Sequence, residues 1–256
     1  MEEIDLVDKV AIITGASSGI GAETAIAFSA YGAKLTLVGR HEGRLMNIAE
    51  KCTTLNHVPL CLLLDLTKEG SCEKVINRTL DTFGKIDILV NCAGKIVLSS
   101  LHDRTMDAFD EVMNINFRVP FRLSQLALPH LIKTKGNIVN IGSSLSKRFK
   151  PGFLPYIVTK SALALMAKHS APELLAEGVR INTISPGMTR TNILSNLNIK
   201  DACLQKLEYD RIAENLPNGQ IIDPKEVASF ICLIASDVFP GVNGAELLID
   251  GTACMT

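Results

Sequence analysis

The apolar residues of this chain gather in short runs that alternate with longer segments of helical periodicity. Seven runs rich in Val, Ile and Leu predict strands at residues 10–13, 35–38, 60–64, 86–90, 138–141, 179–184 and 246–249. Between most of them, apolar positions recur every three or four residues and predict helices at residues 19–31, 42–52, 71–83, 108–131, 156–177 and 224–236. Strands that are apolar throughout and alternate with helices are typical of a parallel sheet covered on both faces.

The regular alternation of strand and helix favours one α/β domain. A chain of 256 residues with 47% hydrophobic content is long enough for a single large core. The sequence has no internal repeat, low-complexity tract or Pro/Gly-rich linker that would divide it. We therefore expect one domain over residues 1–256, with a doubly wound Rossmann fold, a seven-stranded parallel sheet and helices on both faces.

Charge and composition argue against several classes of protein. The formal net charge is −1 and there is no long run of Lys and Arg, which argues against a nucleic-acid partner. Residues 1–5 are acidic where a signal peptide is basic, and no apolar run approaches the roughly 20 residues that span a bilayer. The seven cysteines are scattered, with no CxxC pair and no clustered His, which favours reduced thiols and no metal site. We expect a cytoplasmic protein.

A glycine-rich turn follows the first predicted strand. Residues 14–21 read TGASSGIG and lead directly into a predicted helix. In that position, backbone N–H groups reach a pyrophosphate at the positive end of the helix. The spacing is GxxxGxG and not GxGxxG, and such a turn can also be no more than a tight connection. Its place between strand and helix at the start of the sheet favours a dinucleotide site.

The end of the second predicted strand bears on the choice of dinucleotide. Sheets that bind NAD place an acidic residue there, about 20 residues beyond the glycines, to bind the ribose 2′-hydroxyl. This chain has Gly39 followed by Arg40, and a guanidinium suits a 2′-phosphate. The alternative is a solvated surface arginine. The sequence therefore favours NADP(H) and leaves NAD(H) open.

Tyr156 and Lys160 are four residues apart in a predicted helix, so they share one face of it. A nearby lysine favours the ionised phenol and lowers the tyrosine pKa from about 10 toward working pH. A tyrosine tuned in this way can give or take a proton at a carbonyl or alcohol oxygen. The pair alone is weak, because a packed tyrosine beside a solvated lysine has the same spacing.

Together with further motifs, the chain resembles the short-chain dehydrogenase/reductase family, in its branch of roughly 250-residue enzymes. The resemblance runs from about residue 9 to residue 251. The glycine turn matches the TGxxxGIG of the family, residues 91–94 match its NNAG with Cys92 as the second position, and residues 186–191 match its PGxxxT. Ser143 lies 13 residues before Tyr156, the usual interval of the family. Two departures are Ser18, where many NADP users have a basic residue, and Thr252, in place of a glycine.

The resemblance implies a catalytic set of four residues. Tyr156 is expected to be the acid in carbonyl reduction and the base in alcohol oxidation. Lys160 is expected to lower the Tyr156 pKa and to bind the nicotinamide ribose. Ser143 would donate to the substrate oxygen. Asn116 would hold a water that links Lys160 to solvent, or else is an asparagine that bonds backbone at a helix kink.

The resemblance also implies which residues hold the cofactor. Asp65 sits where the family contacts adenine, and the segment 186–191 sits where it wraps the nicotinamide amide. The cofactor-binding residues that we expect are Gly15, Ser17, Ser18, Gly19, Ile20, Gly21, Arg40, Asp65, Leu66, Asn91, Ala93, Gly94, Tyr156, Lys160, Pro186, Gly187, Thr189 and Thr191.

The substrate side is less clear from the sequence. Residues 188–218 are expected to form a lid, and their apolar members suggest a hydrophobic substrate such as a steroid, a terpenoid or another lipid-like carbonyl: Met188, Ile193, Leu194, Leu197, Leu204 and Leu207. The alternative is that these residues pack a helix against the body of the protein. The basic run at residues 147–150 could meet an anionic group, although a solvated loop is favoured.

The sequence thus predicts an NADP(H)-dependent alcohol dehydrogenase or carbonyl reductase that acts on an apolar alcohol, ketone or aldehyde. An NAD(H)-dependent enzyme of the same family and a non-catalytic dinucleotide-binding protein are the alternatives. Enoyl reductases of the family space Tyr and Lys by six residues, so that activity is disfavoured. Family resemblance also suggests a homotetramer or homodimer built through the two long helices and the last strand.

Overall fold

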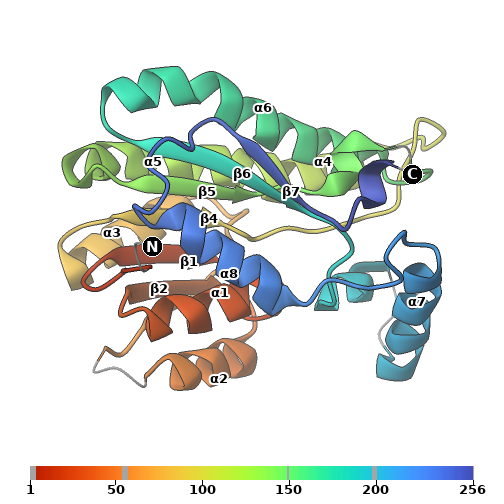
Figure 1. Ribbon diagram of the computed structural model, residues 1–256, viewed down its shortest axis with the longest axis horizontal. Helices are drawn as coiled ribbons and strands as arrows, with labels where there is room; N and C mark the ends of the chain where they lie inside the picture. The colour runs from red at the N-terminus through yellow and green to blue at the C-terminus, as the bar shows by residue number, and fades with distance from the viewer. Residues whose placement is uncertain (1–3, 54–56, 149, 198–200, 256) are drawn as a thin grey trace.

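The fold is built on a seven-stranded parallel sheet (Figure 1). The structure, a computed structural model, describes residues 4–53, 57–148, 150–197 and 201–255. The strands lie in the order β3-β2-β1-β4-β5-β6-β7, and every pairing is parallel. Their bounds are β1 Val10–Thr14, β2 Lys34–Gly39, β3 Leu60–Leu63, β4 Ile88–Asn91, β5 Asn137–Ile141, β6 Arg180–Pro186 and β7 Glu246–Ile249. All seven predicted strands and the doubly wound architecture are confirmed.

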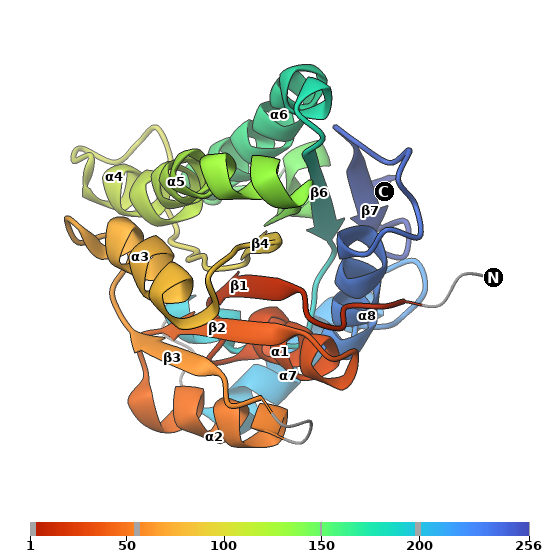
Figure 2. The same ribbon diagram turned by 90° about the vertical axis from the view of Figure 1, so that its left-hand side faces the viewer.

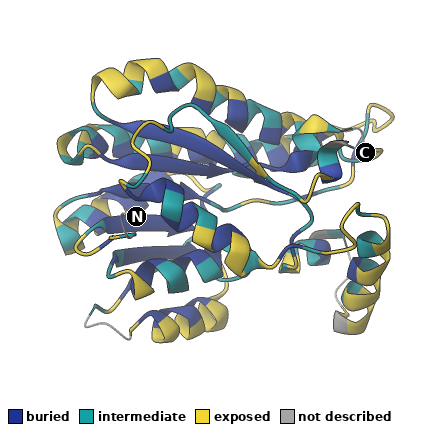
Figure 3. Cartoon of the chain, in the orientation of Figure 1, coloured by how far each residue is buried: buried dark blue, intermediate teal, exposed yellow. Residues whose placement is uncertain are grey.

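Helices cover both faces of this sheet (Figure 2). One layer contains α1 Gly19–Ala30, α2 Glu42–Cys52 and α8 Pro224–Ala235. The other contains α3 Ser71–Phe83, α5 Val119–Thr134 and α6 Leu154–Ala176, with α4 Asp107–Met113 beside α6. Adjacent residues of a strand pack into the cores on opposite faces of the sheet, because side chains alternate along a strand. Ile13 belongs to the core with α1, and Ile12 belongs to the core with α5. Figure 3 shows the buried strands between helices whose outer faces are exposed.

The fourth predicted helix is interrupted. In place of one helix over 108–131, α4 ends at Met113, a five-residue π-helical turn runs over Asn114–Arg118, and α5 follows. Pro120 has no N–H to donate to the carbonyl of Asn116, so regular α-helical bonding fails at this step. Wide turns of this kind are frequent at functional sites.

The strand order reverses between β1 and β4. β1 pairs with β2 on one side and with β4 on the other, so the connections after these strands diverge. In open parallel sheets, ligands bind in the crevice beyond the carboxyl ends of the strands at such a switch point. The fold therefore places the candidate site beyond the carboxyl ends of β1 and β4.

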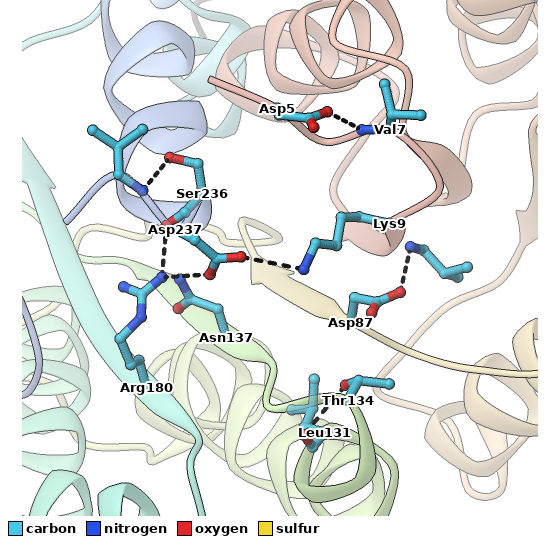
Figure 4. A network of polar contacts seen from close by, with 12 residues as sticks. Asp5, Val7, Lys9, Asp87, Leu131, Thr134, Asn137, Arg180, Ser236 and Asp237 are labelled. Atoms are coloured by element: carbon cyan, nitrogen blue, oxygen red, sulfur yellow. Dashed lines mark hydrogen bonds and ion pairs between the residues drawn. The ribbon is translucent and has the colours of Figure 1, made fainter. Parts of the chain in front are cut away.

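The opposite end of the sheet is closed by a polar network (Figure 4). The buried guanidinium of Arg180 donates to the carbonyl oxygens of Ile234 at 3.1 Å and Ser236 at 2.7 Å. Asn137 donates to the same Ile234 oxygen at 2.7 Å. Both donors begin strands and both acceptors lie at the C-terminal end of α8, where a cation is favourable to the helix dipole. This network fastens α8 to β5 and β6, away from the switch point.

One helix stands outside the two layers. α7 Ala202–Glu214 lies beside the carboxyl ends of the strands, within the segment expected to form a lid (Figure 1). A short 3-10 turn, η4 Asn192–Leu197, precedes it. None of the helices in the described part of the chain is long and apolar enough to cross a membrane.

Candidate active site

A cavity of about 1060 Å³ lies at the switch point and extends under α7. It is lined by the segments that follow six strands, β1 to β6, and by residues of η4 and α7. The structure brings together most of the residues predicted for the site; those that line the cavity are Gly15, Ser17, Ser18, Gly19, Ile20, Arg40, Asp65, Leu66, Ala93, Gly94, Ser143, Tyr156, Lys160, Pro186, Gly187, Thr189 and Thr191. Gly21, Asn91 and Asn116 are the predicted residues that do not line it.

The glycine turn is pinned against the loop after β4. Gly15 has φ of 69°, and a Cβ there would lie 2.9 Å from the Cα of Ala93. Thr14 accepts hydrogen bonds from the backbone N–H groups of Cys92 and Ala93, each at 3.0 Å. Gly21 serves packing, because a Cβ there would lie 2.6 Å from the Gly15 carbonyl oxygen. The turn therefore has to be glycine-rich for the two strand ends to meet.

The N-terminus of α1 opens into this cavity. Its N-cap residue, Ser18, makes no side-chain capping bond, and Gly19 and Ile20 of the first turn line the cavity. First-turn N–H groups without a side-chain cap, at the positive end of a 12-residue helix, suit a phosphate group. The residues present thus fit the pyrophosphate of a dinucleotide.

The end of β5 and the first turns of α6 supply the polar residues of the reaction site. The phenol of Tyr156 is buried beside Ser143, whose Oγ accepts from the backbone N–H of Leu145 at 3.2 Å. Lys160, one helical turn on, donates to the carbonyl oxygen of Ile141 at 2.7 Å. Its Nζ lies 5.7 Å from the centre of the Tyr156 ring. The predicted pair therefore shares one face of α6, inside the cavity.

The acidity of this pair differs from the sequence expectation. Burial raises the pKa of Tyr156 to about 12, and the hydrogen bond from Ser143 offsets part of that rise. Burial also lowers the pKa of Lys160 to about 8. Attraction between phenolate and ammonium would favour both charged forms, but the loss of water around both groups disfavours each charged form. The phenol is therefore neutral at physiological pH, the protonation state that a proton donor needs.

Asn116 occupies the π-helical turn and is fully buried. Its Oδ1 accepts from the backbone N–H of Lys95 at 2.8 Å, and its Nδ2 donates to the Lys95 carbonyl at 2.9 Å and to Thr159 at 3.2 Å. These bonds match an asparagine that holds backbone at a helix kink. A Cβ on Gly94 would lie 3.3 Å from Asn116 Oδ1 and 3.5 Å from Lys160 Nζ. Asn116 thus fixes the loop after β4 close to Lys160.

Asn91 is directed into the sheet and not into the cavity. Its buried amide donates to Asn140 at 2.9 Å and to Ser124 at 3.4 Å, and so links β4 with β5 and α5. The predicted role of Asn91 in cofactor binding stays a prediction, since its side chain does not line the cavity. The next residue, Cys92, lines the cavity, and burial raises the pKa of its thiol to about 12.

The far end of the cavity is cationic. Beside Arg40, the structure places Arg44 and Lys68 in the lining. Sequence reasoning missed both, although Arg44 lies only four residues after Arg40, in the first turn of α2. Asp65 also lines this end; hydrogen bonds from Thr67 lower the pKa of its carboxyl group, with smaller effects of nearby Arg40 and Lys68.

The lid segment faces the cavity with only part of its apolar surface. Met188, Ile193, Leu194 and Leu197 line the cavity as expected. Leu204 and Leu207 of α7 do not, and their side chains are 57% and 64% exposed. The residues of α7 and its C-terminal end that do line the cavity are Glu208, Arg211, Ile212, Asn215 and Leu216.

Tyr209 ties α7 to the loop after β6. It is 3% exposed, donates to the carbonyl oxygen of Thr191 at 2.7 Å and accepts from the Thr191 N–H at 3.1 Å. The guanidinium of Arg190 lies 5.3 Å from the centre of its ring. Sequence reasoning did not identify this contact, which joins residues 18 positions apart.

Comparison with known proteins gives a consistent assignment. A family model described as Enoyl-(Acyl carrier protein) reductase matches residues 15–252. The 2,5-dichloro-2,5-cyclohexadiene-1,4-diol dehydrogenase LinX of Sphingobium indicum is 31% identical over 247 residues, 96% of each chain. This chain belongs to the short-chain dehydrogenase/reductase family. It is accordingly an oxidoreductase that uses a nicotinamide cofactor.

Solved structures of the same family superpose over nearly the whole chain. A short-chain dehydrogenase/reductase of unknown function from Caenorhabditis elegans, crystallised with cofactor, gives a TM-score of 0.92 at 31% identity and covers 98% of this chain and 97% of that one. Glucose dehydrogenase of the same organism, in its apo form, gives 0.82 at 31% identity, with 98% and 99% covered. The family assignment and the Rossmann-type fold predicted from the sequence are confirmed.

Proposed function

We propose that this short-chain dehydrogenase/reductase transfers hydride between NADP(H) and the alcohol or carbonyl carbon of an apolar substrate. The observation that carries the proposal is that Ser143, Tyr156 and Lys160 lie together in the cavity into which α1 opens, with Lys160 Nζ 5.7 Å from the centre of the Tyr156 ring. A bound nicotinamide supplies or accepts the hydride. Tyr156 gives a proton to the carbonyl oxygen in reduction and removes it in oxidation, while Ser143 hydrogen-bonds the same oxygen.

The cations at the far end of the cavity support NADP(H). Arg40, Arg44 and Lys68 line the region beyond β2 and β3 where an adenosine 2′-phosphate would bind. The NAD(H) alternative rests on Ser18, which stands where many NADP users have a basic residue.

The walls around Tyr156 support an apolar substrate. Ile96 and Tyr156 pack with Leu145, Phe153 and Ile193 in one hydrophobic cluster. The relative LinX is named for a chlorinated cyclic diol, which agrees with an apolar alcohol. Glucose dehydrogenase is named for a polar sugar, so the lining of this cavity carries the argument for an apolar substrate.

A panel of apolar ketones, aldehydes and alcohols tests the proposal, with oxidation of NADPH or reduction of NADP+ followed by absorbance at neutral pH. The proposal expects turnover of at least one carbonyl with NADPH. The panel includes an α,β-unsaturated ketone, because reduction of its C=C bond in place of its C=O bond would indicate an enoyl reductase. Tight NADPH binding without turnover of any compound would favour the non-catalytic alternative.

A further inference from the structure

Arg148 lies in the cavity and not in a solvated loop. It directly follows η3 Ser144–Lys147, the 3-10 turn that begins after Ser143. Its side chain is half-buried and lines the same cavity as Ser143 and Tyr156.

The guanidinium of Arg148 is held in place by the C-terminal segment, and no carboxylate among the described residues is paired with it. Nη1 donates to the carbonyl oxygen of Ala253 at 2.8 Å, which anchors the group to the C-terminal segment. Nε is shielded from solvent and has no hydrogen-bond partner within the described ranges. The preceding residue, Lys147, forms an ion pair with Glu246, whereas no carboxylate of the described residues lies within ion-pair distance of Arg148. A guanidinium in a cavity lining, with no carboxylate of the described residues paired to it, can bind the acid group of a ligand through its remaining N–H donors.

Arg148 lies between two lysines, Lys147 and Lys150, but two apolar residues a few positions away pack beside the reaction site. Leu145 and Phe153, on either side of it in sequence, pack in the cluster around Tyr156. Apolar walls strengthen a charge-assisted hydrogen bond, because water competes less for the charged groups. The planar fork of an arginine matches the two oxygens of a carboxylate.

From this arrangement we propose that Arg148 binds a carboxylate at the far end of the substrate. This proposal rests on the proposed function and makes the substrate an oxo acid or a hydroxy acid. The carbon that exchanges hydride lies at Tyr156, an apolar chain follows it, and the acid group reaches Arg148. The apolar cluster then accounts for the middle of the substrate.

Binding of a matched acid and amide tests this subsite without any turnover. Octanoate and octanamide have the same length and nearly the same shape, and differ in charge. Isothermal titration into NADP+-saturated protein at pH 7 is expected to show octanoate binding at least ~10-fold more tightly, the lower end for a hydrogen bond to a charged group. In Arg148→Met, the two ligands should bind within ~2-fold of each other. Lys147→Met, which removes the neighbouring cation outside the cavity lining, should keep the preference.

Two outcomes overturn the subsite: equal binding of the two ligands to the wild type, or a preference that persists in Arg148→Met. The wild-type comparison stands even if Arg148→Met fails to fold. Arg148→Lys, which keeps a charge but loses the planar fork, should retain only part of the preference. Turnover of neutral ketones without acid preference would overturn the subsite alone, whereas failure of all hydride transfer would overturn the proposed function.

Discussion

The cationic end of the cavity makes cofactor choice a prediction that can be worked out from the structure. Replacing Arg40 by Ala removes one guanidinium from the lining and leaves the sheet intact, because the Arg40 side chain is exposed beyond the end of β2. Converting Gly39 to Asp, which would introduce the acidic residue of NAD-binding sheets, is a less clean change. A Cβ on Gly39 would lie 3.1 Å from Ser17 Cβ and 3.2 Å from Leu45 Cδ1, so both neighbours would have to shift.

The expected size of the Arg40 effect follows from its exposure. A hydrogen bond to a charged group contributes about 1.5–3 kcal/mol, which corresponds to roughly 10- to 150-fold in affinity. Water screens an exposed arginine, and Arg44 and Lys68 remain in the lining. We therefore expect an effect at the lower end of this range. The wild type should prefer NADPH over NADH by at least ~10-fold, and Arg40→Ala should reduce that preference by roughly 10-fold.

The assay measures kcat/KM for NADPH and for NADH with one accepted substrate, at low and at high salt. The NADPH value should fall in Arg40→Ala and the NADH value should stay within ~2-fold, because only NADPH carries the 2′-phosphate. Arg78→Ala, an exposed arginine on α3 outside the cavity lining, serves as the matched control and should change neither value. Equal use of both cofactors by the wild type, or an unchanged ratio of the two kcat/KM values in Arg40→Ala, would show that Arg40 does not bind the 2′-phosphate.

Three further predictions concern Lys160 and the lid. Lys160→Ala should weaken NADPH binding as well as turnover, and Lys160→Arg should restore neither fully, as a fluorescence titration and steady-state kinetics will show. In the cofactor-free protein, the Lys160 pKa is lowered from 10.5 to about 8. The unfolded chain then binds more protons between these values, so the free energy of unfolding should rise with pH there in the wild type and rise less in Lys160→Met, as measured with urea. Tyr209→Phe removes the hydroxyl bound to Thr191 and should lower that free energy by about 0.5–1.5 kcal/mol per hydrogen bond; an unchanged unfolding midpoint would argue against the anchor.

The layered fold could be predicted because each strand and helix carries its own burial pattern. The strand at residues 10–13, for example, is apolar throughout, and β1 is buried throughout. The break in the fourth predicted helix was missed although Pro120 signals it, because the apolar periodicity continues across it. The contacts that Asn116 makes in the π-helical turn could not be predicted, because its partner Lys95 is 21 residues away in the sequence. The burial of α7 was also predicted wrongly. Leu204 and Leu207 were expected to face the substrate or pack against the protein, but both are exposed, and Tyr209 is buried.

The candidate site was predictable where one motif fixes one position, as in the glycine turn and the Tyr156–Lys160 pair. The direction of the Tyr156 pKa was not predictable, because it depends on how much water the folded cavity excludes from the phenol. The position of Arg148 in the cavity lining could not be predicted from the sequence either. Its contact with Ala253 joins residues 105 positions apart, and a run of basic residues resembles a solvated loop until that contact is known.

The proton-transfer role of Tyr156 is the central claim, and Tyr156→Phe tests it most directly because it removes only a hydroxyl group. NADPH affinity and kcat are measured for this variant and for Tyr31→Phe, a half-exposed tyrosine at the end of α1 that does not line the cavity. We expect a fall in kcat of at least ~100-fold in Tyr156→Phe, NADPH affinity within ~3-fold of the wild type, and no change in Tyr31→Phe. A near-normal kcat in Tyr156→Phe would show that the Tyr156 hydroxyl does not transfer the proton.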